Sequence, residues 1–116
     1  MKLTIGTHKD HPCVTVDGKI ERNDIIELDV TLTEQAQKAK DVLILDLAGV
    51  EAAASGVISA IVDASNSMQE KGGVLKIYDP HPHVLDLFRR LGLHQTLKFF
   101  KSSRHKSGEE PTKKRP

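Results

Sequence analysis

The most constraining feature of this sequence is an apolar run near its middle, at residues 41–47, which read Asp-Val-Leu-Ile-Leu-Asp-Leu. Within it, the residues from Val42 to Leu45 are all apolar and do not alternate with polar ones. A continuous run of this kind indicates a strand buried on both faces, whereas alternation would indicate one exposed face. Such a strand needs helices or loops on both sides of its sheet. We therefore predict an α/β fold with this segment as its central, buried strand.

Hydrophobic periodicity places the other elements around that strand. Alternating or apolar runs predict further strands at 2–5, 13–17, 74–78 and 97–100, the last one at an edge. Apolar spacings of three and four predict helices at 24–39, 55–71 and 82–91. Residues 6–12 are expected to form a polar connection between the first two strands. The sum is an α/β domain with a central sheet of four to five strands and three to four helices.

Local signals mark where these helices begin and end. Asp24 followed by Glu27 resembles a capping box at the start of the first helix. Gly72 and Gly73 are expected to stop the second helix, and Gly92 the third, because glycine readily adopts the left-handed conformation that ends helices.

The chain divides into a mildly acidic body and a basic tail. Its 116 residues are near the usual size of one domain. Residues 101–116 carry six Lys/Arg and two Glu out of totals of 17 and 16, so the rest carries eleven basic and fourteen acidic residues. Residues 102–116 contain no aliphatic or aromatic side chain with which to recover ordering entropy by burial. We predict a domain over residues 1–101 and a disordered tail over 102–116.

Composition argues against several functional classes. With three Phe, one Tyr and no Trp, the sequence predicts no platform for stacking bases, so no specific nucleic-acid partner is expected. Cys13 is the single cysteine, which rules out an internal disulfide and favours a reducing compartment. No apolar run approaches the roughly 20 residues of a membrane span, and no signal peptide is evident. We expect a cytoplasmic protein without membrane insertion.

Candidate catalytic and metal-binding residues are few. His8, His11 and Cys13 offer nitrogen and sulfur ligands, but a structural zinc site needs four ligands and no second pair is evident. Asp46, at the end of the central strand, has no neighbouring base or second carboxylate in a catalytic pattern, so hydrogen bonding within the loop is expected. His81 and His83 are expected to be solvent-facing loop residues. We therefore predict no catalytic site, no metal and no cofactor.

The order of elements and several short motifs resemble the STAS domain of bacterial anti-sigma-factor antagonists. The resemblance covers about residues 1–100 and implies a mixed central sheet of four to five strands with three to four helices. Its matching segments are the turn at 17–21, the central strand and loop at 42–50, the helix start at 55–58, the segment 72–75, and the last helix within 85–97, which ends at Gly92-Leu93.

One motif departs from the family's pattern. The regulatory site of these proteins typically reads D-S-[ST]-G at the start of the second helix, and here Ala53, Ala54, Ser55 and Gly56 occupy those places. The alanine at position 54 has no hydroxyl to accept a phosphate. Ser55 is the remaining candidate phosphoacceptor, although the favoured interpretation is that its side chain caps the helix.

The resemblance implies a regulator that works by binding another protein. The expected partner is an anti-sigma factor of the serine-kinase-like type, and a weak homodimer is a further candidate assembly. The residues implied for partner binding lie in the turn after the second strand and at the start of the second helix: Gly18, Lys19, Ala53, Ala54, Ser55, Gly56 and Ser59. The alternative is a STAS subunit that binds the ATPase of an ABC-type lipid-transport complex. An enzyme, with nucleotide hydrolysis as its form, is the third class.

Overall fold

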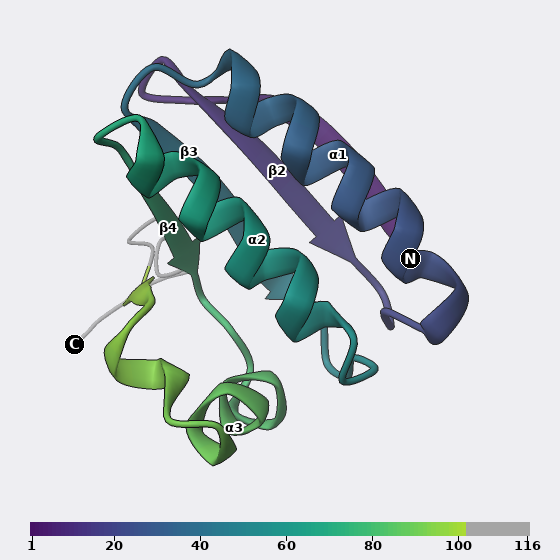
Figure 1. Cartoon of the computed structure of the whole chain (residues 1–116). Helices are drawn as coiled ribbons and strands as arrows, with labels where there is room; N and C mark the ends of the chain where they lie inside the picture. Colours follow the sequence, from purple (N-terminus) through teal and green to yellow (C-terminus); the bar gives the residue numbers. More distant parts are fainter. Residues whose placement is uncertain (102–116) are drawn as a thin grey trace, which may run out of the picture.

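The computed structural model describes residues 1–101, which form a five-stranded sheet with three α-helices (Figure 1). The strands are β1 (Lys2–His8), β2 (His11–Asp17), β3 (Val42–Gly49), β4 (Val74–Tyr78) and β5 (Lys98–Phe100). The α-helices are α1 (Ile25–Lys38), α2 (Val57–Glu70) and α3 (Pro82–Arg90). Short 3₁₀ turns occupy η1 (Arg22–Asp24) and η2 (Leu93–Gln95). The predicted disordered tail, 102–116, lies outside the described residues.

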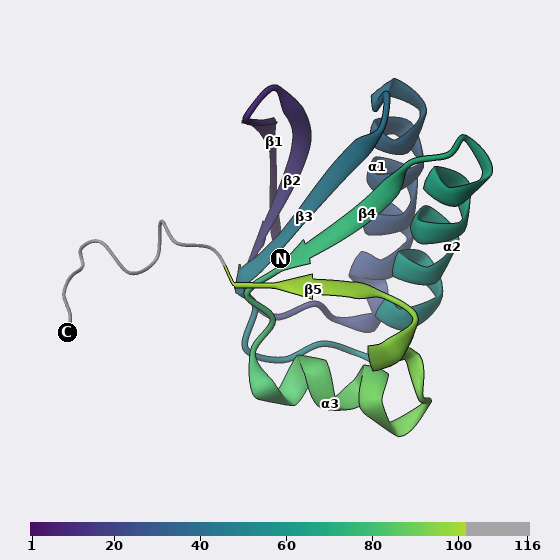
Figure 2. The same ribbon diagram turned by 90° about the vertical axis from the view of Figure 1, so that its left-hand side faces the viewer.

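The sheet follows chain order, β1-β2-β3-β4-β5, with β1 antiparallel to β2 and the other pairs parallel. Each parallel pair is joined through a helix, as parallel strands require. Figure 2 shows α1 and α2 side by side on one face of the sheet, with α3 at the end where β3 and β4 finish. The prediction of β3 as the central strand is confirmed.

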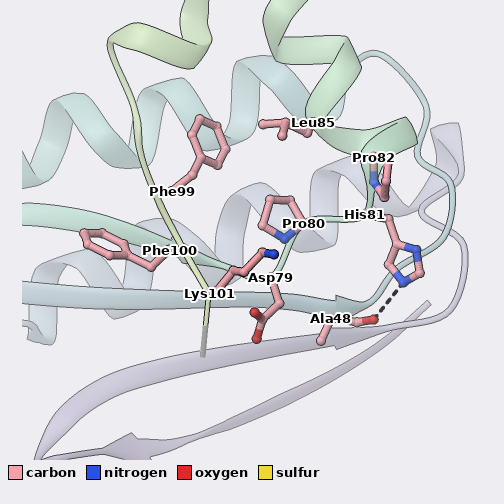
Figure 3. Close-up of a pocket in the computed structure, with 9 residues that line it drawn as sticks. All are labelled: Ala48, Asp79, Pro80, His81, Pro82, Leu85, Phe99, Phe100 and Lys101. Atoms are coloured by element: carbon pink, nitrogen blue, oxygen red, sulfur yellow. Dashed lines mark hydrogen bonds between the residues drawn. The ribbon is translucent and has the colours of Figure 1, made fainter. Parts of the chain in front are cut away.

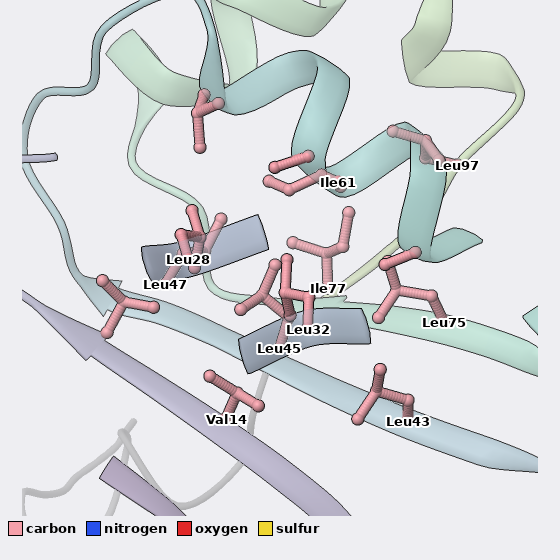
Figure 4. Close-up of a cluster of buried hydrophobic side chains, with 14 of the residues drawn as sticks. Val14, Leu28, Leu32, Leu43, Leu45, Leu47, Ile61, Leu75, Ile77 and Leu97 are labelled. Carbon is pink, nitrogen blue, oxygen red and sulfur yellow. The ribbon is translucent and has the colours of Figure 1, made fainter. Parts of the chain in front are cut away.

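The core lies between this sheet and the two helices (Figure 4). Alternate residues of β3, namely Leu43, Leu45 and Leu47, are fully buried, as are Leu28 and Leu32 of α1. Burial of such side chains stabilises the fold by about 1.5–3 kcal/mol each relative to exposure. The helical pattern of the sequence therefore predicted correctly which faces of α1 and α2 meet the sheet.

The other face of β3 is also buried, which explains why its apolar run does not alternate. Ile44 and Asp46 are only 2% and 3% exposed. The sheet curls on this side. This is indicated by the His8 ring of β1, which lies 6.0 Å from the Tyr78 ring of β4 although two strands separate β1 from β4 in the sheet. The Tyr78 ring in turn lies 5.7 Å from that of Phe100.

Two local predictions were wrong. The connection expected at 6–12 is only the turn Lys9-Asp10, since β1 continues to His8 and β2 starts at His11. Both turn residues have positive φ, of 54° and 68°, as a tight hairpin turn requires. The capping box is formed by Glu21 and Asp24 instead of Asp24 and Glu27: the Asp24 carboxylate accepts a 2.8 Å hydrogen bond from the Glu21 N–H. Asp24 thus caps the 3₁₀ turn that leads into α1.

Candidate functional site

Backbone hydrogen bonds bring the two segments of the predicted binding site together. The Ile20 N–H donates to the Ala52 carbonyl at 3.1 Å, and the Ala54 N–H donates to the Ile20 carbonyl at 2.7 Å. These bonds make a short parallel bridge between Ile20 and Ala53. Because Ile20 is fully buried, it anchors the bridge in the core. Residues 34 positions apart in sequence, 20 and 54, are therefore fixed next to each other.

The turn after β2 is also held close to the end of β3. Gly18 has φ +88° and donates its N–H to the Gly49 carbonyl at 2.9 Å. A side chain on Gly49 would collide with the Asp17 carboxylate. Glycine at position 49 thus lets the end of β3 come this near the turn, and glycine at position 18 supplies a backbone conformation that other residues rarely adopt.

The start of α2 differs from the prediction for Ser55. The helix begins at Val57, two residues later than expected, and no side-chain hydrogen bond caps it. The turn is closed by backbone bonds instead, from the Val57 N–H to the Ala54 carbonyl and from the Ile58 N–H to the Ser55 carbonyl, at 3.0 and 3.1 Å. The interpretation of Ser55 as a cap is therefore wrong, and its side chain is exposed.

We call the predicted set of seven residues the docking surface: Gly18, Lys19, Ala53, Ala54, Ser55, Gly56 and Ser59. All but the two alanines are exposed, and the alanines are half-buried. Lys19 forms a 4.0 Å ion pair with Glu21, and both side chains are about two-thirds exposed, so the pair contributes little to stability. The surface is thus built of small residues around one cation.

Ile25 borders the docking surface and was not among the residues predicted for it. Ile25, the first residue of α1, is half-buried, and a Cβ built on Gly56 would lie 3.4 Å from its Cγ1. Periodicity placed Ile25 on the helical core face, and it does pack against the core, while its side chain also lies near the start of α2. No motif in the sequence marks this contact.

The other candidate residues are placed as follows. Asp46 accepts a 3.0 Å hydrogen bond from the Ala48 N–H, so its bonding is local as expected, but both residues lie at the end of β3 and not in a loop. His8 and His11 face each other across the first hairpin, and Cys13 pairs with Gly6. Within residues 1–101, no three His, Cys, Asp or Glu side chains are grouped so as to hold a metal ion.

The two histidines at the start of α3 behave differently from each other. His83 is exposed, as predicted. His81 is only partly exposed and its Nε2 lies 3.0 Å from the Ala48 carbonyl oxygen, so its description as a solvent-facing residue was wrong. In the part of the chain that the structure describes, no helix has the length and apolar character needed to cross a bilayer.

Solved structures with this fold include several anti-sigma-factor antagonists. A STAS domain protein of that kind from Planctomyces limnophilus has a TM-score of 0.80 at 14% identity, covering 89% of this chain and 92% of its own. SpoIIAA in its unphosphorylated form has a TM-score of 0.76 at 10% identity, covering 93% and 94%. Phosphorylated SpoIIAA from Bacillus has a TM-score of 0.70 at 11% identity, covering 93% and 97%. At these identities the likeness establishes the fold.

Sequence comparison supplies the family. No curated protein matches the chain. The family model of the STAS domain matches residues 2–105, which is nearly the whole of the sequence. This chain therefore belongs to the STAS domain family.

Proposed function

We propose that this protein is an anti-sigma-factor antagonist that binds a serine-kinase-like anti-sigma factor through the docking surface and performs no catalytic step itself. The observation that carries the proposal is the bridge between Ile20 and Ala53, which joins the turn after β2 and the start of α2 into one exposed surface. The structures it resembles are those of anti-sigma-factor antagonists, which supports the same class of partner.

The docking surface suits a partner that approaches the backbone closely. Gly18, Ala53 and Gly56 have little or no side chain, so a partner meets main-chain groups at the start of α2. Lys19, Ser55 and Ser59 supply hydrogen-bonding groups around them. Binding of this surface would sequester the anti-sigma factor and release the sigma factor that it holds.

The proposal includes the loss of the usual phosphorylation switch. In the family's motif the acceptor serine falls at position 54, where this chain has alanine. Phosphoryl transfer needs an oxygen nucleophile in line with the nucleotide, and a methyl group supplies none. We expect the protein to bind its partner without being inactivated by phosphorylation at this position.

The first experiment identifies the partner and maps its contact. The tagged protein is purified from its native host, and a co-purifying serine-kinase-like protein is expected by mass spectrometry. Affinity for that purified partner is then measured by calorimetry. Ser59→Arg should weaken binding at least tenfold, because a long cation replaces a small side chain in the contact. Ser67→Arg is the matched control, since Ser67 is exposed on the same helix two turns further on.

Two outcomes would contradict this function. Recovery of a transport ATPase in place of a kinase-like protein would support the lipid-transport alternative. Equal effects of Ser59→Arg and Ser67→Arg would show that the partner binds elsewhere.

The second experiment restores the switch. The backbone at Ala54 is bonded on both sides, to Ile20 and Val57, so Ala54→Ser adds one oxygen without moving the chain. The double variant Ala53→Asp with Ala54→Ser should become a phosphoacceptor when incubated with the partner and ATP. Ala54→Asp alone should weaken partner binding by charge repulsion and desolvation.

Phosphate is located by mass spectrometry, with Ser55→Ala as the control. Stoichiometric phosphorylation of wild-type Ser55 with release of the partner would show that the switch had moved by one residue.

A further inference from the structure

A cavity of about 550 Å³ lies at the carboxyl edge of the sheet (Figure 3). It is bounded by the end of β3, the connection from β4 to α3, the first turns of α3, and β5 with the residue that follows it. No docking-surface residue lines it. Open α/β sheets commonly bind ligands at this edge, and the volume falls within the roughly 300–1,000 Å³ of small-molecule sites.

The walls of the cavity are held by local covalent and hydrogen-bond constraints. Pro80 and Pro82 fix the backbone of the β4–α3 connection, because their rings lock φ. The Asp79 N–H donates to the Phe100 carbonyl at 2.8 Å, so this connection stays attached to the end of β5. The site is therefore largely formed before any ligand arrives.

His81 ties the opposite wall to β3. Its Nε2 lies 3.0 Å from the Ala48 carbonyl oxygen, which only accepts hydrogen bonds, so Nε2 carries the proton and donates it (Figure 3). His81 is also the N-cap residue of α3, with an extended backbone at φ −63° and ψ 153°. A single side chain thus joins the start of α3 to the end of the central strand.

The lining is apolar on most sides and carries a cation at its rim. The apolar side chains that point into the space are Pro80, Pro82, Leu85 and Phe99 (Figure 3). Lys101, which is exposed, brings an ammonium group to the same cavity and forms no ion pair within residues 1–101. Asp79 also lines the cavity and has an interaction partner in the protein, and Lys101 is the one Lys or Arg of the lining within the described residues.

We propose that this cavity binds a small organic anion with an apolar body, such as an aromatic or medium-chain carboxylate or sulfonate. The apolar body packs between the prolines, Leu85 and Phe99, and the anionic group faces Lys101. Neither the proposed partner nor the phosphorylation switch is needed for this site, so its test is independent of theirs.

The test uses the full chain and 8-anilinonaphthalene-1-sulfonate, a fluorescent anion with an apolar ring system. Saturable binding with a stoichiometry of one is expected. Decanoate should displace the probe at a concentration at least threefold lower than decanol, because only decanoate carries the charge that Lys101 attracts. Backbone amide shifts in an NMR titration with decanoate should be largest at Ala48, His81, Leu85 and Lys101.

Variants distinguish binding at this site from non-specific hydrophobic binding of the probe. Lys101→Gln should weaken probe binding threefold to tenfold and reduce its dependence on salt. Lys98→Gln is the matched control, since Lys98 is an exposed cation three residues earlier that does not line the cavity. Leu85→Trp should weaken probe binding, because the larger ring occupies part of the space in which the apolar body packs, and the fold of that variant is checked by its amide spectrum.

Four results would overturn the proposal. Absence of saturable binding to the wild-type protein would remove the site. Equal displacement by decanol and decanoate, or equal effects of the two lysine variants, would refute an anionic ligand. Amide shifts centred on α1 or on the docking surface would place the binding elsewhere.

Discussion

Replacement of Lys71 by methionine should lower the free energy of unfolding by about 1–2 kcal/mol. The Lys71 ammonium, just after α2, donates hydrogen bonds of 2.7 Å to the carbonyls of Ala36 and Ala39, and one of 3.4 Å to that of Gln37. These carbonyls end α1, so one cation satisfies the acceptors that a helix leaves without intrahelical partners. Methionine keeps the apolar stem and removes the donor.

The magnitude follows from the two short bonds and the helix dipole. A hydrogen bond to a charged group contributes about 1.5–3 kcal/mol, and a cation at a helix C-terminus adds about 0.3–1 kcal/mol. Lys71 is exposed, so in the variant water replaces much of the lost hydrogen bonding. The sum of these contributions is therefore reduced to the value of about 1–2 kcal/mol expected for the variant. With a slope of about 2 kcal/mol per molar urea, the middle of the usual range, the unfolding midpoint should fall by about 0.5–1 M.

Urea unfolding followed by circular dichroism measures this difference. Lys40→Met is the matched control, because Lys40 is exposed near the same helix end and makes no hydrogen bond or ion pair within the described residues. It should change the midpoint by less than 0.2 M, as surface substitutions usually do. If the two variants are equally stable, water satisfies the α1 carbonyls as well as Lys71 does, and the reasoning fails.

Three further outcomes are expected from the fold. Leu45→Ala, at a fully buried position of β3, should lower the free energy of unfolding by about 2–5 kcal/mol, measured by thermal or urea unfolding. Ile26→Ala, at a side chain that is 78% exposed, should lower it by less than about 0.5 kcal/mol. Equal effects of the two variants would contradict the core assignment. Gly72→Ala should lower the free energy of unfolding by about 1 kcal/mol, because Gly72 has a φ of +82° that alanine adopts only with strain. Gly6→Ala is its control: an added Cβ meets no atom at either position, but Gly6 has no positive φ, so this variant should not be destabilised. Deletion of 102–116 should leave the melting temperature within about 2 °C of wild type, and loss of cooperative unfolding would show that the tail supports the domain.

Most of the fold was predictable because it depends on patterns that burial imposes. The run at 42–45 identified the central strand, and spacings of three and four identified α1 and α2, since an apolar face must be covered wherever it lies. What the sequence did not show was decided by backbone geometry. The turn Lys9-Asp10 has positive φ without glycine or asparagine, and Asp10 is its only residue of a type that commonly marks a hairpin.

The candidate site was predicted only in part. Resemblance to the family named both of its segments, but the bridge between Ile20 and Ala53 that joins them depends on main-chain atoms, which every sequence has. The cavity at the carboxyl edge was missed because its walls come from three separate segments around Ala48, Leu85 and Phe99. Each is unremarkable in sequence, and only the parallel arrangement of β3, β4 and β5 brings them together.

The mixed sheet also determines when this chain is most vulnerable during synthesis. β1 and β2 pair through a two-residue turn, and such a hairpin closes in about 1–10 μs. The other edge of β2 pairs with β3. Because β2 ends at Asp17 and β3 ends at Gly49, this edge stays unpaired while the ribosome adds the 32 residues between those two positions. At about 5–20 residues per second this takes about 2–6 s. An unpaired strand edge is a template for association with other chains. The nascent hairpin, which is a well-paired element of the finished protein, is therefore the species that a ribosome-bound chaperone would have to protect.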